Sequence, residues 1–227
     1  MSKEHAQLTQ MLTEPTVETD GSYKFTLGQA GANTLILMES GIGKVNAAVG
    51  ATTLIRCCHP DAIISTGCAG GIDERLNVMD VVVSTAVAYH DVIIPGCEPG
   101  QVQGFPARFD CDVRLLRAAT AIPNPTTPIH AGLICSGDQF ISDHGQLSQI
   151  KSQHPDALAV DMESAAIAHT CFLHNLPFLS FRILSDTPGA DAHFQQYLDF
   201  WSQMAQRSFS ITRQFLNTLP SQLDAPA

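Results

Sequence analysis

The residues of this sequence that could do chemistry are carboxylates placed directly after apolar runs. Asp161 and Glu163 follow the apolar residues 157–160, and Asp186 follows the apolar stretch 178–184. If such runs are strands of an open α/β sheet, their carboxyl ends lie at the edge where ligands bind. Carboxyl groups at such an edge can transfer protons or stabilise positive charge that develops in a reaction. The alternative is structural, because a carboxylate at the start of a helix also stabilises that helix.

Several apolar runs end in small or acidic residues, which indicates that they share a site. The endings are SGIG (40–43), GCAGG (67–71), SGDQF (136–140), DMES (161–164) and SDTPG (185–189). If the runs are strands of one sheet, these endings can meet at one edge. Glycine lets a backbone amide approach a ligand closely. Such a convergence would be a coincidence in a purely structural domain, so we predict a ligand site there.

The two glycine-rich endings do not match nucleotide-binding fingerprints. Segment 40–44 lacks the glycine spacing of a P-loop, and Val45 stands where a P-loop has Ser or Thr. Segment 67–71 lacks the second half of the dinucleotide-binding fingerprint. A tight turn before a helix, or after a strand, explains these glycines equally well.

The pattern of apolar residues and turn signals predicts an α/β protein that positions these endings. The predicted strands are 22–27, 34–38, 62–66, 81–88, 131–135, 156–159 and 178–184. The predicted helices are 2–12, 45–55, 112–122, 145–154, an alanine-rich segment after Asp161, and 194–219. Residues 90–110 form a long loop rich in Pro and Gly, and loops of that length are usually functional or mobile.

Composition restricts the class of protein and its partners. We expect one domain spanning residues 1–227, because the length and the 44% hydrophobic content suit a single large core. The net charge of −10, with 12 Lys and Arg, argues against nucleic acid as the main partner. The polar N-terminus and the lack of long apolar runs predict no signal peptide and no membrane contact. The 7 cysteines have no metal-ligand spacing, so we expect free thiols in a reducing cytoplasm and no metal site.

Ordered segments along the chain carry a resemblance to a known family. They are SGIGKVNAA (40–48), STGCAGGI (65–72), VVVSTAVAYHD (81–91), CSGDQFI (135–141), VDMESAAIAH (160–169) and FRILSDT (181–187). In this order they resemble the 5′-methylthioadenosine/S-adenosylhomocysteine nucleosidases of the nucleoside phosphorylase superfamily. The resemblance covers almost the whole chain and implies a single-domain three-layer α/β/α sandwich with a mixed central sheet flanked by helices. It also implies hydrolysis of the N-glycosidic bond of an adenine nucleoside, without a cofactor, by a homodimer.

The resemblance assigns the proton transfers to two acids. Asp186 would be the general acid that protonates N7 of adenine, with Arg182 and Ser185 positioning it. This proton converts adenine from a poor anionic leaving group into a neutral one. Glu4 would be the general base that activates water. Without the resemblance, Glu4 is simply a first-turn glutamate that complements a helix dipole.

The resemblance also assigns the residues that bind the nucleoside. Glu163, with the backbone of Met162, would bind the ribose hydroxyls and stabilise the oxocarbenium-like charge. Asp161 stands where relatives usually have Glu. Phe140 would stack on adenine, and backbone groups of Ile141 would read the base edge. An aromatic residue at such a position is otherwise more often part of the core.

Two further segments would complete the pocket by resemblance. Ile42 would line it, and Cys68-Ala69-Gly70 would pack against sugar and base. Most relatives have Ser at the position of Cys68, so this chain replaces a hydroxyl with a thiol there.

The chain departs from the family pattern in two places. Relatives carry an apolar strand that ends in Gly-Ala before the methionine that matches Met1, so we expect the first strand of the sheet to be missing. Its loss would expose the edge of a neighbouring strand. The loop after His90-Asp91 is shorter than in the best-known relatives, in which a Phe of this loop covers the 5′-alkylthio group across a dimer interface. Here no aromatic residue precedes Phe105 in that loop.

Three functions therefore stay open at this point. The first is a hydrolase that acts on a 5′-thioadenosine nucleoside. The second is a phosphorylase of the same fold, which would need converging arginines for phosphate, whereas only Arg182 adjoins a site motif. The third is a nucleoside-binding relative without activity. The ordered motifs and their acids favour the hydrolase, while the preferred 5′ substituent stays open.

Overall fold

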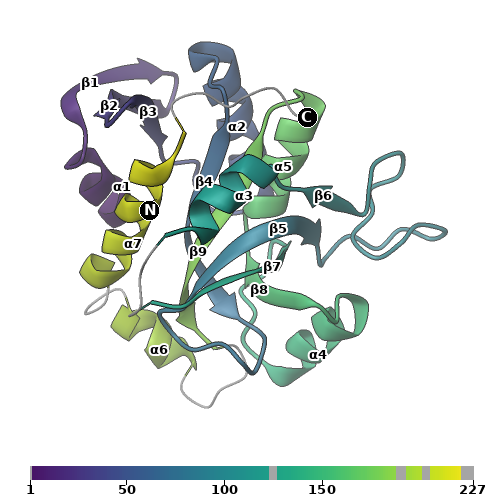
Figure 1. Ribbon diagram of the computed structural model, residues 1–227. Coiled ribbons are helices and arrows are strands. Elements are labelled where there is room, and N and C mark those ends of the chain that lie inside the picture. The colour runs from purple at the N-terminus through teal and green to yellow at the C-terminus, as the bar shows by residue number, and fades with distance from the viewer. Residues whose placement is uncertain (1, 123–126, 188–192, 201–204, 221–227) are drawn as a thin grey trace.

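A computed structural model describes residues 2–122, 127–187, 193–200 and 205–220 (Figure 1). The strands are β1 Thr13–Asp20, β2 Tyr23–Ala30, β3 Asn33–Met38, β4 Ile63–Gly71, β5 Val81–Tyr89, β6 Arg108–Asp110, β7 Ile129–Ser136, β8 Ala157–Asp161 and β9 Phe178–Asp186. The helices are α1 Ser2–Thr9, α2 Lys44–Cys58, α3 Val113–Thr120, α4 His144–Gln153, α5 Ser164–Leu173, α6 His193–Asp199 and α7 Ala205–Thr218. The protein is thus of the α/β class, as the sequence predicts.

The strands form two sheets. A mixed six-stranded sheet has the order β6-β5-β7-β8-β4-β9, and a separate antiparallel sheet has the order β1-β2-β3. An additional antiparallel pairing of β5 with β9 connects strands from the two ends of the larger sheet, so that this sheet is closed. Register shifts place one extra residue in each of β9, β5 and β8, and such β-bulges bend strands and so help this closure. The mixed sheet agrees with the expectation from the sequence, whereas the closure and the separate small sheet differ from the single central sheet of the expected sandwich.

The core lies between the closed sheet and the helices around it. Residues 81–83 of β5 are fully buried, and all of β9 is buried, including its polar residues Ser180, Arg182, Ser185 and Asp186. Phe181 of β9 stacks on Phe215 of α7 at a centroid distance of 4.8 Å. Helix α5 is buried over most of its length, and its alanines let it pack closely against the sheet. This packing fixes the position of Glu163, the residue that precedes α5.

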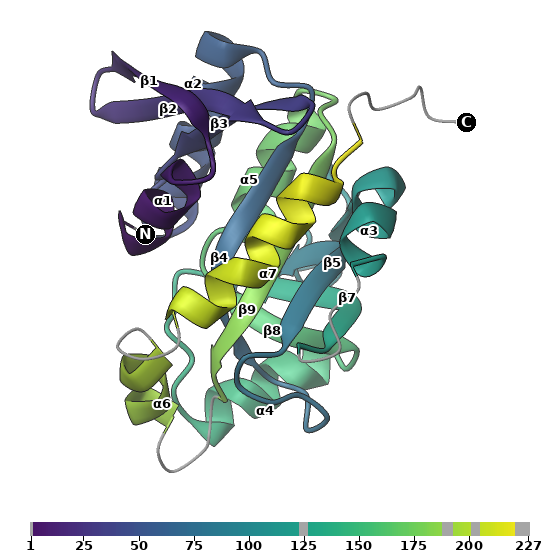
Figure 2. The same cartoon turned by 60° about the vertical axis from the view of Figure 1, so that its left-hand side comes forward.

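Two strand edges face one cavity without a strand between them. Strand β3 pairs only with β2, and residues 63–69 of β4 pair only with β9 among the described residues. Side chains of both strands, including Leu35, Leu37 and Ile64, line the same cavity. Helix α1 lies beside this opening, below the small sheet (Figure 2).

Two local predictions from the sequence differ from the structure. Residues 13–20, which the sequence assigned to no helix or strand, form β1, and residues 108–110 of the expected loop form β6. In the range of the expected helix 194–219, residues 193–199 form α6 and residues 205–218 form α7, and residues 201–204 lie outside the described part. Among the described residues, no helix has the length and apolar character needed to cross a membrane.

Candidate active site

The five strand endings meet at a cavity of about 790 Å³. The lining includes all thirteen residues that the sequence suggests for a site: Glu4, Ile42, Cys68, Ala69, Gly70, Phe140, Ile141, Asp161, Met162, Glu163, Arg182, Ser185 and Asp186. The first ending, 40–43, follows β3 of the small sheet. Residues 67–71 are the last five residues of β4, and the other three endings begin with the last residues of β7, β8 and β9 in the closed sheet. The convergence thus involves both sheets.

A buried ion pair joins Asp161 and Arg182 in the lining of the cavity. Arg182 Nε lies 2.8 Å from Asp161 Oδ2, and both side chains are almost fully buried. Asp161 also accepts hydrogen bonds from the hydroxyls of Ser136 and Ser164, and Arg182 donates to the hydroxyl of Ser65 at 2.8 Å. These contacts occupy both side chains, so we interpret the pair as a structural anchor of the site.

Glu163 lies between this anchor and the cavity. Its Oε1 accepts the backbone N–H of Gly43 at 3.1 Å, and its Oε2 lies 3.9 Å from Arg182 Nη2. Burial raises the pKa of Glu163, while the charge of Arg182 opposes that shift and the nearby charge of Asp161 adds to it. A carboxylate held in this way faces the cavity with little solvent to screen its charge.

Asp186 closes the opposite wall at the end of β9. Its side chain is buried, and Ser185 Oγ donates a hydrogen bond to its Oδ1 at 2.6 Å. Cys68 is its neighbour in the wall, and burial is the main cause that raises the pKa of this thiol to about 12. The charges of Glu4 and Asp186 add to that shift, which places both acids near the thiol. The thiol is therefore protonated at neutral pH.

Helix α1 brings Glu4 to the cavity. Glu4 and His5 line it, and His5 Nε2 lies 3.3 Å from the hydroxyl of Thr26 on β2. The helix is thereby attached to the small sheet, which agrees with its position in Figure 2. The position of Glu4 thus depends on the small sheet as well as on α1.

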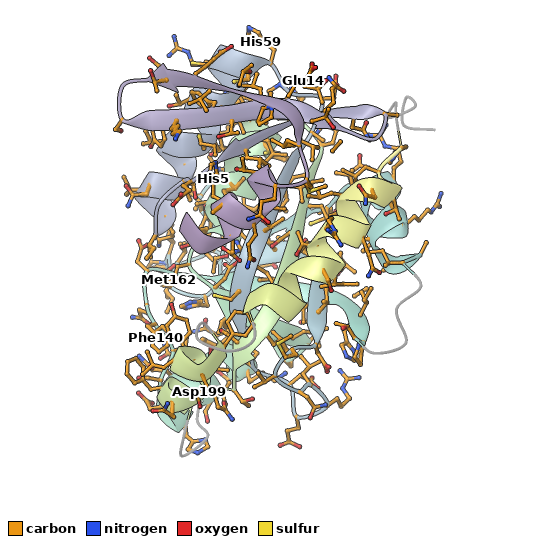
Figure 3. All side chains as sticks on the ribbon, turned by 90° about the vertical axis from the view of Figure 1, so that its left-hand side faces the viewer. His5, Glu14, His59, Phe140, Met162 and Asp199 are labelled. Carbon is orange, nitrogen blue, oxygen red and sulfur yellow. The ribbon has the colours of Figure 1, made fainter. Side chains whose placement is uncertain are left out.

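An aromatic group borders the cavity on the side of α6. Phe140 is 44% exposed and lies edge-on to Tyr197, with the ring centroids 5.5 Å apart. Figure 3 shows Phe140 and Met162 on the same face of the molecule as His5. Ile141 is buried, whereas Ile42 is 62% exposed. An exposed ring that faces a cavity offers a flat surface to a base, which a core phenylalanine does not.

Comparison with known proteins gives the family. The model of the phosphorylase superfamily matches residues 1–217. A 5′-methylthioadenosine/S-adenosylhomocysteine nucleosidase of Anoxybacillus flavithermus is 41% identical over 204 residues, which cover 87% of this chain and 88% of the relative. The chain belongs to this nucleosidase family of the phosphorylase superfamily.

Solved structures of nucleosidases support the assignment. The enzyme of Colwellia psychrerythraea, in complex with adenine, matches with a TM-score of 0.91 and 33% identity, over 98% of this chain and 94% of that one. The enzyme of Neisseria meningitidis, in complex with methylthio-immucillin-A, matches with a TM-score of 0.91 and 34% identity, over 96% of each chain. The nucleosidase fold of this chain is therefore shown by sequence and by structure.

Some contacts of this nucleosidase-family site were not found from the sequence. The backbone N–H of Gly43, the hydroxyls of Ser136 and Ser164, and the ring of Tyr197 all contact predicted site residues. Only Ser164 lies within a motif next to the acid that it contacts. The others come from distant segments, and no spacing in the sequence relates them to their partners.

Phe105, the first aromatic residue of the long loop, does not line the cavity. It packs against His169 at a centroid distance of 4.6 Å and against Phe172 at 6.4 Å. Within this chain it is therefore part of an aromatic cluster. The side chain that covers the 5′ end of a ligand is not supplied by Phe105 of the same chain.

The lining is strongly acidic. Glu4, Glu39, Asp161, Glu163 and Asp186 line the cavity, and Arg182 is the only Arg or Lys among its described lining residues. The described residues also contain no group of three or more His, Cys, Asp or Glu placed to hold a metal ion. Such a lining favours a ligand that is neutral or positively charged over an anion.

Proposed function

We propose that this chain hydrolyses the N-glycosidic bond of 5′-methylthioadenosine or S-adenosylhomocysteine, releasing adenine and the 5-thioribose product. The observation that carries the proposal is that Asp186, Glu163 and Phe140 line one cavity, as the reaction requires. The related nucleosidases, which bind adenine or a nucleoside analogue in their structures, support the same reaction.

The residues suggest an order of events. The bond between N9 of adenine and C1′ breaks, and its electron pair moves to the base. Asp186 donates a proton to N7, so that adenine leaves as a neutral molecule. Glu163 stabilises the positive charge on the sugar and binds its hydroxyls. A water molecule then adds to C1′ and gives its proton to Glu4.

Charge argues against phosphate as the nucleophile. A phosphate dianion needs converging cations, and bidentate arginines are the usual ones. Arg182 is the one Arg or Lys described in the lining, and its guanidinium already pairs with Asp161 and lies 3.9 Å from Glu163. Phosphate would also meet the charges of several acids. We therefore favour hydrolysis over phosphorolysis.

We expect purified protein to release adenine from at least one 5′-substituted adenosine. Chromatography of adenine release from methylthioadenosine, S-adenosylhomocysteine and 5′-deoxyadenosine tests this. A version with an apolar strand added before Met1 serves as the comparison, because the unpaired edge of β4 and the support of Glu4 should both gain from it. Binding of these nucleosides without adenine release by either version would contradict the proposal and favour an inactive binding relative.

We also propose that the chain forms a homodimer through α2. Ile42, Val45 and Val49 are 62%, 73% and 50% exposed and lie at the start of this helix and on it. Apolar side chains grouped in this way are typical of a protein interface. Light scattering should give twice the chain mass, and a monomer at all concentrations would exclude the dimer.

A further inference from the structure

Three charged residues from different segments meet outside the cavity. Lys44 begins α2, Asp91 follows β5, and Asp138 follows β7. Lys44 Nζ donates a hydrogen bond to Asp91 Oδ2 at 2.7 Å and lies 3.8 Å from Asp138 Oδ2. Asp91 Oδ2 also accepts the backbone N–H of Asp138 at 2.9 Å. None of the three lies among the residues that line the cavity.

The network holds the turn that contacts Glu163. Gly43 precedes α2 with φ of 89°, a conformation that favours glycine, and no side chain at that position caps the helix. Asp138 Oδ1 supplies the cap from another segment, because it accepts the N–H of Lys44 at 2.7 Å. The adjacent N–H, that of Gly43, donates to Glu163 Oε1. The position of Asp138 therefore sets the direction of the amide that holds Glu163.

The same network holds the segment that carries Phe140. Asp138 stands two residues before Phe140, and its N–H is bound by Asp91. Gly137 donates its N–H to the carbonyl of Asp161 at 3.2 Å. One end of the aromatic segment is thus attached both to the network and to the strand that leads to Glu163.

Lys44 and Asp91 form a partly buried ion pair within this network. Burial would raise the pKa of Asp91, but the hydrogen bonds from Lys44 and from the N–H of Asp138 outweigh it and lower that pKa. The side chains of Lys44 and Asp91 are 25% and 16% exposed, so solvent screens their attraction only in part. Asp91 therefore stays charged at neutral pH.

We propose that Lys44, Asp91 and Asp138 are positioning residues that align Glu163 and Phe140 for the reaction. The inference rests on the proposed function. The three residues act through others, because their contacts lead to the Gly43 amide and to the 138–140 segment. Loss of the network should therefore lower the rate of reaction by misplacing Glu163, while the protein stays folded.

The test is a double-mutant cycle of Lys44→Met and Glu163→Gln. Because small misplacements of catalytic groups can cost about 10²-fold, we expect Lys44→Met to lower kcat/KM by about 10- to 100-fold, mainly through kcat. In the Glu163→Gln background the same change should have little further effect, because residues that act together are not additive. Arg75→Met, which removes an exposed charge paired with Asp73, is the matched control and should leave kcat/KM unchanged.

The outcomes separate this inference from the proposed function. No adenine release by the unchanged protein would overturn the function. Adenine release by the unchanged protein with full activity in Lys44→Met, or with equal losses in both backgrounds of the cycle, would overturn only the positioning role. If circular dichroism shows that Lys44→Met does not fold, Asp138→Ala carries the same cycle, since it removes the acceptor that caps the N–H of Lys44. Full activity in that variant would also overturn the inference.

Discussion

Replacing Asp186 with asparagine is expected to lower kcat for adenine release by about 10²- to 10⁴-fold, the usual contribution of a general acid. Asparagine has the same shape and can still accept the hydrogen bond that Ser185 donates to Oδ1 at 2.6 Å. It cannot donate a proton as an acid does, so adenine would have to leave as an anion. The binding of substrate should change far less than the rate.

The control for this experiment is Asp156→Asn, which changes the same chemical group at the surface. Asp156 is 55% exposed and pairs with Arg108 away from the cavity. It should retain the activity of the unchanged protein. Steady-state kinetics of adenine release gives kcat and KM for both variants. If Asp186→Asn retained full kcat, the assignment of the general acid would be wrong.

Replacing Arg182 with methionine is expected to destabilise the protein by about 3–5 kcal/mol, the usual cost of breaking a buried ion pair. Methionine fills much of the volume of arginine but leaves the buried carboxylate of Asp161 without its cation. It also removes the donors to the hydroxyls of Ser65, Ser164 and Ser180. The free energy of unfolding, measured by denaturant titration, reports the loss.

Arg108→Met provides the comparison, because it removes the same group from an exposed pair. Arg108 and Asp156 are 41% and 55% exposed and form two hydrogen bonds, of 2.6 and 2.9 Å. Such surface pairs contribute about 0–1 kcal/mol, so the loss should be small. Equal losses in the two variants would show that Arg182 is not a buried anchor.

The strands of the core could be predicted from the sequence because most of their residues are apolar. Residues 81–88 and 178–184 read as buried strands, and the structure has strands there. β1 could not be predicted, since all eight of its residues are exposed and Pro15 stands within it. It pairs with β2, and no local pattern in residues 13–20 reveals that pairing.

Contacts between distant segments also could not be predicted. Closure of the sheet pairs residues 81–83 with 181–183, and short-range patterns contain no information on that contact. The network of Lys44, Asp91 and Asp138 also joins residues that lie far apart in the sequence. In the sequence each of these residues is simply a charge in a turn.

The sequence predicted which residues line the site better than it predicted which of them contact each other. The strand endings placed Glu163 and Asp186 at one cavity, although their roles stay predictions. Arg182 was expected to position Asp186, four residues away. Its ion pairs in the structure are with Asp161 and Glu163. Separation along the chain cannot show which acid a buried arginine reaches, because the neighbouring strands supply the partners.

The most direct test of the account is to identify the sugar product that forms in water enriched in oxygen-18, with phosphate present. Purified protein is incubated with 5′-methylthioadenosine, and mass spectrometry identifies the products. The account predicts free adenine and a thioribose that carries oxygen-18 at C1, with a rate that phosphate does not change. A sugar 1-phosphate, or a rate that depends on phosphate, would contradict it.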